Sequence, residues 1–273
     1  MKSQLALIAL VLIGCSSPAA DTTTTSMSSS IPATVTSTAV AIGPMVYAPA
    51  AMGEYPVAVL FHGGGWFGGS PLSTVALAEY LAENDVVVFN STYRTSDGGG
   101  YPESFDDVAC AIRDAKEQAA GYTTTPDDLT VIAHSAGAHL SAVVALSPEV
   151  FGGECAAGVE VDRFVGLSGV YDPTLYTQLL ATFFHSRFEN DPAPWEAGSP
   201  YTYIEDNPDL SFLLLHGDDD QLVPASSSSL FAEALEAADH EVTLEVIPGG
   251  DHQSTRQPDP AGPLILDFLT NAS

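Results

Sequence analysis

Six short apolar runs, separated by stretches with helical spacing, constrain the fold of this chain more than any other feature. The runs are Val57–Phe61, Val86–Phe89, Leu129–Ala133, Phe164–Leu167, Phe212–Leu215 and Val242–Ile247. Strands that are apolar on both faces belong to parallel sheets covered by helices, and their connections are right-handed crossovers. The pattern predicts an α/β fold with a mostly parallel central sheet flanked by helices.

The stretches between the runs supply the expected helices. Their apolar residues recur three and four positions apart, with charged residues on the other face. They are Leu72–Glu83, Phe105–Ala119, Ala136–Leu146, Ser226–Ala238 and the closing Leu264–Leu269. Upstream, Val35–Pro49 carries β-branched residues interrupted by Gly43 and Pro44, which predicts one or two edge strands.

Residues 171–208 interrupt this alternation. They are rich in aromatic residues and proline, and the only helix expected in them lies near Thr174–Phe184. Loops over the carboxyl ends of a parallel sheet line its active site, so we expect this insertion to be a lid or pocket wall. The chain has 273 residues and no internal repeat, and residues 39–273 are expected to form one domain.

The amino terminus has the pattern of an export signal. Leu5–Ile13 is apolar, too short to cross a bilayer and of the right size for a signal core. Leu12-Ile13-Gly14-Cys15 resembles the lipobox of bacterial lipoproteins, in which the signal is cut before a lipid-carrying cysteine. Residues 1–14 would then be the signal and 15–38 a Ser/Thr-rich tether beginning at lipidated Cys15. An ordinary signal peptide with a chance cysteine is the alternative.

This interpretation predicts export across the inner membrane to the cell envelope, where the lipid is the only membrane contact. Cys110 and Cys155 would then fold outside the reducing cytoplasm and could pair, or Cys110 could be a small buried side chain. The sequence leaves both open, and neither cysteine has metal-ligand spacing.

The charge balance excludes one class of partner. The chain has 35 acidic and 7 basic residues, for a formal net charge of −28. Binding to a phosphate backbone needs clustered Lys and Arg, and here these residues are scattered. Nucleic acid is therefore not an expected partner.

A serine with small neighbours follows the third run. Ser135 stands between Ala133 and an Ala-rich helix, with Ala136 and Gly137 directly after it. A sharp strand-to-helix turn lifts a hydroxyl out of the sheet and needs small residues so that strand and helix can approach. We therefore expect Ser135 to be an accessible nucleophile, with the amide of Ala136 pointing toward whatever it attacks.

Three successive glycines follow the first run, in His62-Gly63-Gly64-Gly65-Trp66. Glycines lose much conformational freedom on folding, so a run of them indicates a sharp bend or a close approach to a ligand. Backbone amides in such a loop can stabilise an oxyanion together with the amide of Ala136. A plain glycine-rich turn is the alternative.

Acidic residues and a histidine follow the last two runs. Asp218-Asp219-Asp220 comes after the fifth run and Asp251-His252 after the sixth. Serine, acid and histidine thus occur in the order of an α/β-hydrolase triad, each beyond the carboxyl end of a strand. Any of the three adjacent aspartates can be a solvated turn residue, and Asp172 is another acid that could reach the histidine.

These four motifs together resemble the α/β-hydrolase esterases, closest to the hormone-sensitive-lipase-like, small carboxylesterase and kynurenine-formamidase-like members. The resemblance extends from Val57 to the carboxyl end. It implies Ser135 as nucleophile, His252 as base, and Asp220, which stands before x-x-Val-Pro, as the orienting acid. It also implies oxyanion donors, which are Gly64, Gly65 and Ala136. One departure is Ala133, where the family's elbow has its first glycine.

Further contacts are assigned as hypotheses. Trp66, His134 and Trp195 are predicted substrate contacts, although aromatic residues at such positions are as often part of the core. The other histidines are expected to have structural or solvated roles. We expect His62 and His216 to bond backbone groups, His139 to pack or hydrogen-bond, and His185 and His240 to be solvated.

The sequence thus favours an exported, lipid-anchored serine hydrolase. Its substrates would be small to medium uncharged carboxylic esters, cleaved through an acyl-enzyme without a cofactor. An amidase or arylformamidase with the same triad is the first alternative. A catalytically silent surface lipoprotein that binds a ligand in the same cleft is the second.

Overall fold

The structure is a computed structural model and describes residues 43–271. The expected signal, Cys15, the tether and the first part of the expected edge-strand segment lie outside the described residues. Within residues 43–271, no helix is both long and apolar enough to cross a membrane.

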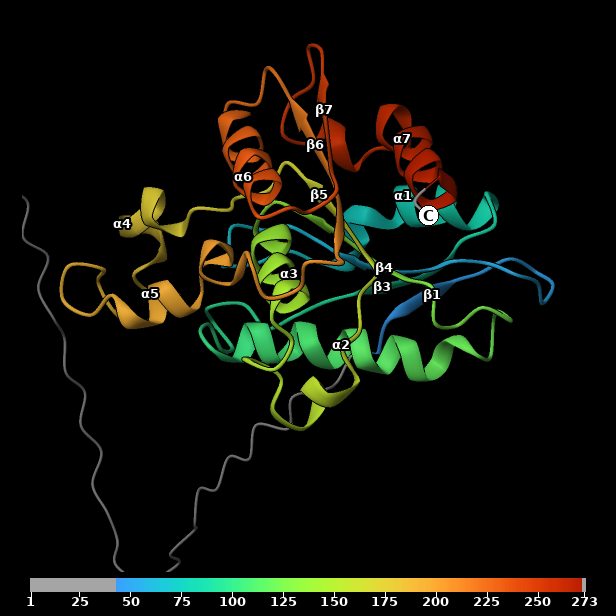
Figure 1. Cartoon of the computed structure of the whole chain (residues 1–273), viewed down its shortest axis with the longest axis horizontal. Helices are drawn as coiled ribbons and strands as arrows, with labels where there is room; N and C mark the ends of the chain where they lie inside the picture. Colours follow the sequence, from blue (N-terminus) through green and yellow to red (C-terminus); the bar gives the residue numbers. More distant parts are fainter. Residues whose placement is uncertain (1–42, 272–273) are drawn as a thin grey trace, which may run out of the picture. The chain divides into compact units, whose positions relative to one another are not determined.

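Seven strands form a single sheet in the order β1-β3-β2-β4-β5-β6-β7 (Figure 1). All neighbours pair in parallel except β1, which runs antiparallel to β3 at the edge. The strands are β1 (Met45–Tyr47), β2 (Val57–Phe61), β3 (Val87–Ser91), β4 (Leu129–His134), β5 (Arg163–Leu167), β6 (Ser211–Gly217) and β7 (Val242–Ile247). The predicted mostly parallel sheet is confirmed.

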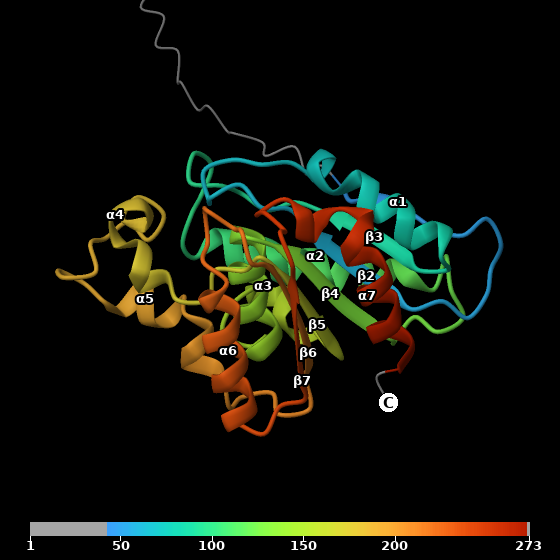
Figure 2. The same ribbon diagram turned by 90° about the horizontal axis from the view of Figure 1, so that it is seen from above.

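Helices cover both faces of the sheet. On one face lie α1 (Val75–Glu83) and α7 (Pro258–Asn271), which appear together above the sheet in Figure 2. The other face carries α2 (Glu103–Ala119), α3 (Ala136–Leu146) and α6 (Ser226–Ala237). Short 3₁₀ helices complete the fold: η1 (Pro71–Thr74), η2 (Gly153–Gly158), η3 (Pro173–Tyr176), η4 (Pro200–Tyr203) and η5 (Ser254–Arg256).

Strand β2 shows why the apolar runs are continuous. All its residues are buried, and successive side chains enter different cores. Val57, Val59 and Phe61 join the core beneath α2 and α3, whereas Ala58 and Leu60 join the core beneath α1 and α7. A strand with helices on both sides has no face left for polar residues.

The insertion at residues 171–208 differs in detail from the expectation. The helix expected over Thr174–Phe184 is only η3 followed by α4 (Thr177–Leu180), and a second helix, α5 (Ala193–Ala197), was not expected. Pro192 precedes α5 and Pro194 lies in its first turn. Proline suits a first helical turn, because the N–H that it lacks would have no acceptor within the helix there.

A disulfide joins Cys110 of α2 to Cys155 of η2. This resolves the question that the sequence left open, in favour of pairing.

We predict that reducing this bond destabilises the fold. The cysteines are 45 positions apart, and closing a loop of that length corresponds to about 4 kcal/mol in the chain-entropy account. Urea unfolding followed by circular dichroism should give a clearly lower midpoint with dithiothreitol than without it. The double variant Cys110→Ala/Cys155→Ala is the control, since its midpoint should not respond to dithiothreitol. Equal midpoints for the oxidised and reduced wild type would contradict the prediction.

Candidate active site

Ser135 occupies the sharp turn between β4 and α3, with φ 54° and ψ −119°. A positive φ is strained for a residue with a side chain and persists only where the surroundings enforce it. The Ser135 amide donates to the carbonyl of Leu167 at 2.9 Å, and its own carbonyl accepts from the amide of His139 at 3.2 Å. Both neighbours of the turn therefore hold it in place.

Small residues allow this turn. A Cβ on Gly137 would lie 2.3 Å from the carbonyl oxygen of His62, so only glycine fits there. Ala133, the departure from the family elbow, is fully buried within β4, beside Gly166 of β5. Ser135 keeps its strained conformation with alanine at that position.

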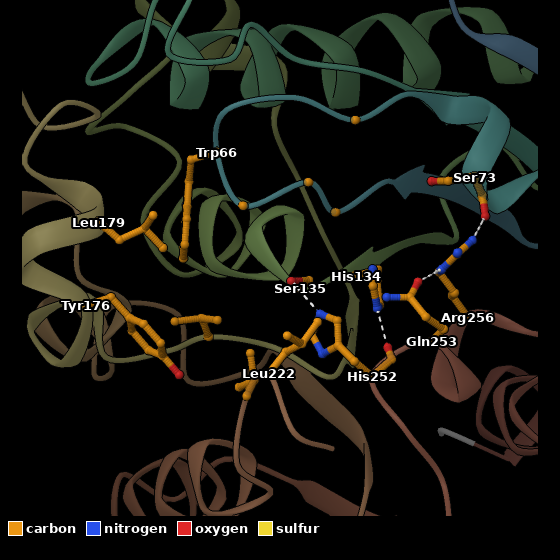
Figure 3. Close-up of a pocket in the computed structure, with 16 residues that line it drawn as sticks. Trp66, Ser73, His134, Ser135, Tyr176, Leu179, Leu222, His252, Gln253 and Arg256 are labelled. Carbon is orange, nitrogen blue, oxygen red and sulfur yellow. Dashed lines mark hydrogen bonds between the residues drawn. The ribbon is translucent and has the colours of Figure 1, made fainter. Parts of the chain in front are cut away.

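His252, in the loop after β7, links Ser135 to Asp220. Its Nε2 lies 2.9 Å from Ser135 Oγ, as Figure 3 shows by a dashed line. Its Nδ1 lies 2.7 Å from Asp220 Oδ2. Because a carboxylate can only accept, Nδ1–H donates to it and Nε2 is left to accept the serine proton. A hydroxyl, an imidazole and a carboxylate connected in this way can make the hydroxyl nucleophilic.

Asp220 is buried at the end of β6 and is surrounded by donors. Its Oδ1 accepts from the amides of Leu222 at 2.8 Å and Val223 at 2.9 Å. His216 Nε2 lies 3.2 Å from Oδ2, which also accepts from His252. Burial alone would raise the pKa of Asp220, but the Val223 amide, the His252 ring and the Leu222 amide together hold it below its ordinary value. The carboxylate is therefore ionised.

The alternative acids have other partners. Asp218 is exposed and accepts from the amide of Gly249, and Asp219 is exposed and accepts from the side chain of Gln221. Asp172 accepts from the amide and hydroxyl of Thr174, so its carboxylate opens the turn at Pro173. Of the acids considered from the sequence, the structure places Asp220 against the histidine.

Gly64 and Gly65 line the same cavity as Ser135. Gly64 has φ 147°, and a Cβ there would lie 2.0 Å from the carbonyl oxygen of Gly68. Within residues 43–271, no acceptor takes the N–H of Gly64, Gly65 or Ala136. These three amides are therefore available to an oxygen of a ligand.

His134, next to Ser135, is fixed beneath the histidine loop. Its Nε2 donates to the carbonyl of His252 at 2.8 Å. Burial lowers the pKa of His134 to about 3, so its ring is neutral at neutral pH. His134 also lines the cavity, and its contact with the backbone of His252 holds that loop beside Ser135.

His139 of α3 connects Trp66 to the insertion. It accepts from Trp66 Nε1 at 3.1 Å through Nδ1, and its Nε2 donates to the carbonyl of Gly198 at 2.8 Å. Burial lowers the pKa of His139 to about 4. A neutral ring is required here because a protonated Nδ1 could not accept from the indole.

The cavity around Ser135 has a volume of about 500 Å³ and two chemically different sides. In Figure 3, Trp66, Tyr176 and Leu179 lie on one side of Ser135, and Ser73 and Arg256 lie on the other. Two of these residues, Tyr176 and Leu179, come from residues 171–208, as expected for a pocket wall. Val170, Leu222 and Val223 also line the cavity, and Gln253 lies beside Arg256.

Trp195, a predicted substrate contact, is not part of this cavity. It is fully buried, packs against Phe184 and Phe188, and donates from Nε1 to the hydroxyl of Ser186. The assignment was wrong because α5 turns the indole into the core of the insertion.

Four cavity residues were not predicted from the sequence: Tyr176, Leu179, Leu222 and Arg256. Only Arg256 carried a signal, as a rare cation four positions after His252.

The remaining histidines follow the expectations except one. His62 lies 2.7 Å from the carbonyl of Gly63, and His216 lies 2.9 Å from the carbonyl of Val223. His185 is exposed. His240, expected to be solvated, is only 5% exposed, and its ring nitrogens lie 3.1 and 2.6 Å from the carbonyls of Leu210 and Ile204. The end of the insertion covers it, and helix polarity alone could not reveal that.

The strained serine follows the central strand of a mostly parallel sheet, and its acid and histidine partners follow later strands. This arrangement defines the α/β-hydrolase superfamily. Residues 45–235 match the family model described as BD-FAE. The chain belongs to the BD-FAE family.

Among residues 43–271, no group of three or more His, Cys, Asp or Glu side chains is placed to hold a metal ion.

Individual relatives agree with this placement. The chain is 30% identical to "Esterase LipQ" of Mycobacterium tuberculosis, over 72% of this chain and 50% of that protein. It is 27% identical to "Probable isoprenylcysteine alpha-carbonyl methylesterase ICMEL1" of Arabidopsis thaliana, over 76% of this chain and 47% of that protein. The chain thus spans about half the length of these curated relatives.

A solved structure shares the fold. It is described as a "truncated form of carbohydrate esterase from gut microbiota", and its TM-score is 0.73 at 22% identity. The match covers 82% of this chain and 88% of that one.

We predict that acid destabilises this protein partly through His139. Between about pH 6.5 and pH 4 the unfolded chain binds a proton at this residue that the folded protein does not, so the unfolding free energy falls as the pH falls. From pH 7 to pH 5 the loss from one such group is on the order of 2 kcal/mol. Urea unfolding at both pH values should show a smaller loss for His139→Gln than for the wild type.

The matched control is His185→Gln, which changes an exposed histidine of the insertion. Its pH dependence should follow that of the wild type. The same pH dependence for His139→Gln and the wild type would contradict a neutral buried ring at position 139.

Proposed function

We propose that this protein is a carboxylic ester hydrolase that works through an acyl-enzyme. The observation that carries the proposal is the hydrogen-bonded series Ser135–His252–Asp220, which opens into a cavity beside three unoccupied amides. The names of two relatives, an esterase and a methylesterase, point to the same bond.

In the proposed reaction, Ser135 Oγ attacks the carbonyl carbon of the ester while His252 Nε2 takes the hydroxyl proton. Negative charge then develops on the carbonyl oxygen, where the amides of Gly64, Gly65 and Ala136 can donate to it. The new imidazolium is stabilised by the ionised Asp220 and returns its proton to the departing alkoxide. Water then attacks the acyl-serine by the same route and releases the carboxylic acid.

The surroundings suit this sequence of steps. The positive φ of Ser135 lifts its hydroxyl out of the sheet, and His134 holds the loop that carries His252. Because these groups are positioned before substrate binds, little reorganisation is needed as charge develops. The volume of the cavity, about 500 Å³, suits small to medium esters.

We predict that Ser135→Ala abolishes ester hydrolysis and leaves the fold intact. The variant should lose about a million-fold in kcat, as expected when a nucleophile of this kind is removed. Release of p-nitrophenol from p-nitrophenyl acetate and butyrate measures turnover, and circular dichroism reports the fold. A fluorophosphonate probe should label the wild type and not the variant.

Ser141→Ala provides the matched control. Ser141 lies in α3, the helix that follows Ser135, and its buried hydroxyl has no hydrogen-bond partner within residues 43–271. This variant should keep wild-type turnover and labelling. Near wild-type hydrolysis by Ser135→Ala would refute the proposal.

We also predict that Asp220→Asn lowers kcat strongly and changes KM little. An amide at this position cannot stabilise the imidazolium and can favour the wrong histidine tautomer, so kcat should fall by about 10³-fold or more. Asp218→Asn alters a neighbouring exposed carboxylate and should leave kcat within about twofold, the usual range for a surface change. Similar losses in both variants would argue against Asp220 as the orienting acid.

A further inference from the structure

Arg256 is an unusual cation in this acidic protein. The chain carries 35 acidic and 7 basic residues, and most basic side chains in the described part are paired with carboxylates. The pairs are Arg94 with Asp107, Arg113 with Asp114, Lys116 with Glu160, and Arg163 with Asp128. Within residues 43–271, Arg187 and Arg256 have no carboxylate within 4.0 Å. Of these two, only Arg256 lines the cavity that contains Ser135.

Backbone and amide oxygens hold the Arg256 guanidinium in place without neutralising it. Its Nε donates to Gln253 Oε1 at 2.5 Å, and its Nη1 donates to the carbonyl of Ser73. The side chain thus bridges η5, which follows His252, and η1, which follows the glycine loop. The other guanidinium N–H groups have no acceptor within the described residues, so they can donate to a ligand.

Asp251, whose charge acts on Arg256, does not accept a hydrogen bond from it. Asp251 is close enough to act on Arg256 electrostatically, but its carboxylate accepts from the amides of Gln253 and Ser254 and from the Ser254 hydroxyl. No ion pair joins Asp251 to Arg256. The guanidinium therefore has no ion-paired carboxylate at this wall of the cavity within residues 43–271.

The position of Arg256 relative to Ser135 gives this charge a role. Figure 3 shows the guanidinium on the side of Ser135 opposite to Trp66, Tyr176 and Leu179. Partial burial lowers the pKa of Arg256, yet a guanidinium stays charged at any physiological pH. A partly desolvated, preoriented guanidinium favours a planar carboxylate, which it can bind through two parallel hydrogen bonds.

We propose that Arg256 binds a carboxylate group of the substrate, so that the enzyme selects esters with an anionic end and an apolar end. This inference rests on the proposed ester hydrolysis and departs from the uncharged esters expected from the sequence. The net charge of −28 repels anions in general, so binding of a carboxylate ester needs a local cation such as this one. Arg256 is thus assigned to specificity, and the bond-breaking steps stay with Ser135 and His252.

The test uses two pairs of esters that differ only in a carboxylate or its uncharged carboxamide. In the first pair, 4-acetoxybenzoate and 4-acetoxybenzamide, the group is on the alcohol side of the ester. In the second, monoethyl terephthalate and ethyl 4-carbamoylbenzoate, it is on the acyl side. For each pair the measured quantity is the ratio of kcat/KM for the carboxylate to kcat/KM for the carboxamide.

For the wild type at low ionic strength we expect a ratio of about ten or more in one pair, the effect of one or two charge-assisted hydrogen bonds. That pair identifies the side of the ester that faces Arg256. Arg256→Gln should bring the ratio to about one, mainly through KM. Arg256→Lys, which keeps the charge and loses the planar fork, should give an intermediate ratio.

Arg187→Gln is the matched control, because it removes the other unpaired arginine and lies outside the cavity. Its ratios should equal those of the wild type. Raised ionic strength should lower the wild-type ratio, which depends on the charge of Arg256. It should not lower the ratio of Arg256→Gln, because only the general repulsion of anions is left for salt to screen.

Two outcomes would overturn the inference alone. One is a wild-type ratio at or below one in both pairs while the carboxamide esters are hydrolysed with Ser135. The other is that Arg256→Gln lowers kcat/KM by the same factor for the carboxylate and the carboxamide of each pair. Arg256 would then only link η5 to η1. Arg256→Lys decides the question if the glutamine variant does not fold. Absence of Ser135-dependent hydrolysis for all four esters would overturn the proposed function as well.

Discussion

Parallel pairing of β4 through β7 is the constraint on which the rest of this structure depends. Parallel strands end at the same edge of a sheet, so Ser135, Asp220 and His252 meet there although 117 positions separate the serine from the histidine. Burial on both faces fixes the register of β4, β5 and β6, since a one-residue slip would exchange the two cores. The hydrogen bonds of 2.9 and 2.7 Å at His252 are thus set by packing far from them.

A layer of neutral histidines supports the site. His134 holds the backbone of His252, His139 joins Trp66 to the insertion, and His216 contacts Asp220. Burial lowers the pKa of all three, which keeps each ring able to donate from one nitrogen and accept at the other. Histidine therefore serves both as the proposed proton carrier and as rigid support. The hydrogen-bond partners of each ring decide which role it has.

The cavity combines an apolar wall with a charged one. Tyr176 and Leu179 of the insertion and Trp66 of the glycine loop supply the first, and Arg256 supplies the second. The apolar wall can bury hydrocarbon parts of a substrate, and this interaction has no preferred direction. The guanidinium is held by two acceptors, so its remaining N–H groups form hydrogen bonds in fixed directions. On our proposals, substrate orientation over Ser135 results from this difference.

The sequence by itself determined the layered sheet and the strand positions within a few residues, because local periodicity encodes them. Motif order predicted Ser135 and His252, and Asp220 was implied only by the resemblance to the α/β-hydrolase esterases; the structure places these three side chains in contact. The sequence did not determine whether Cys110 and Cys155 pair, where Trp195 points or that His240 is buried. Nor did it show that Arg256 has no ion-paired carboxylate among residues 43–271. Each of these depends on which distant segments pack together. Residues 171–208 have no regular period to reveal their packing, so only the tertiary structure decided the shape and charge of the cavity.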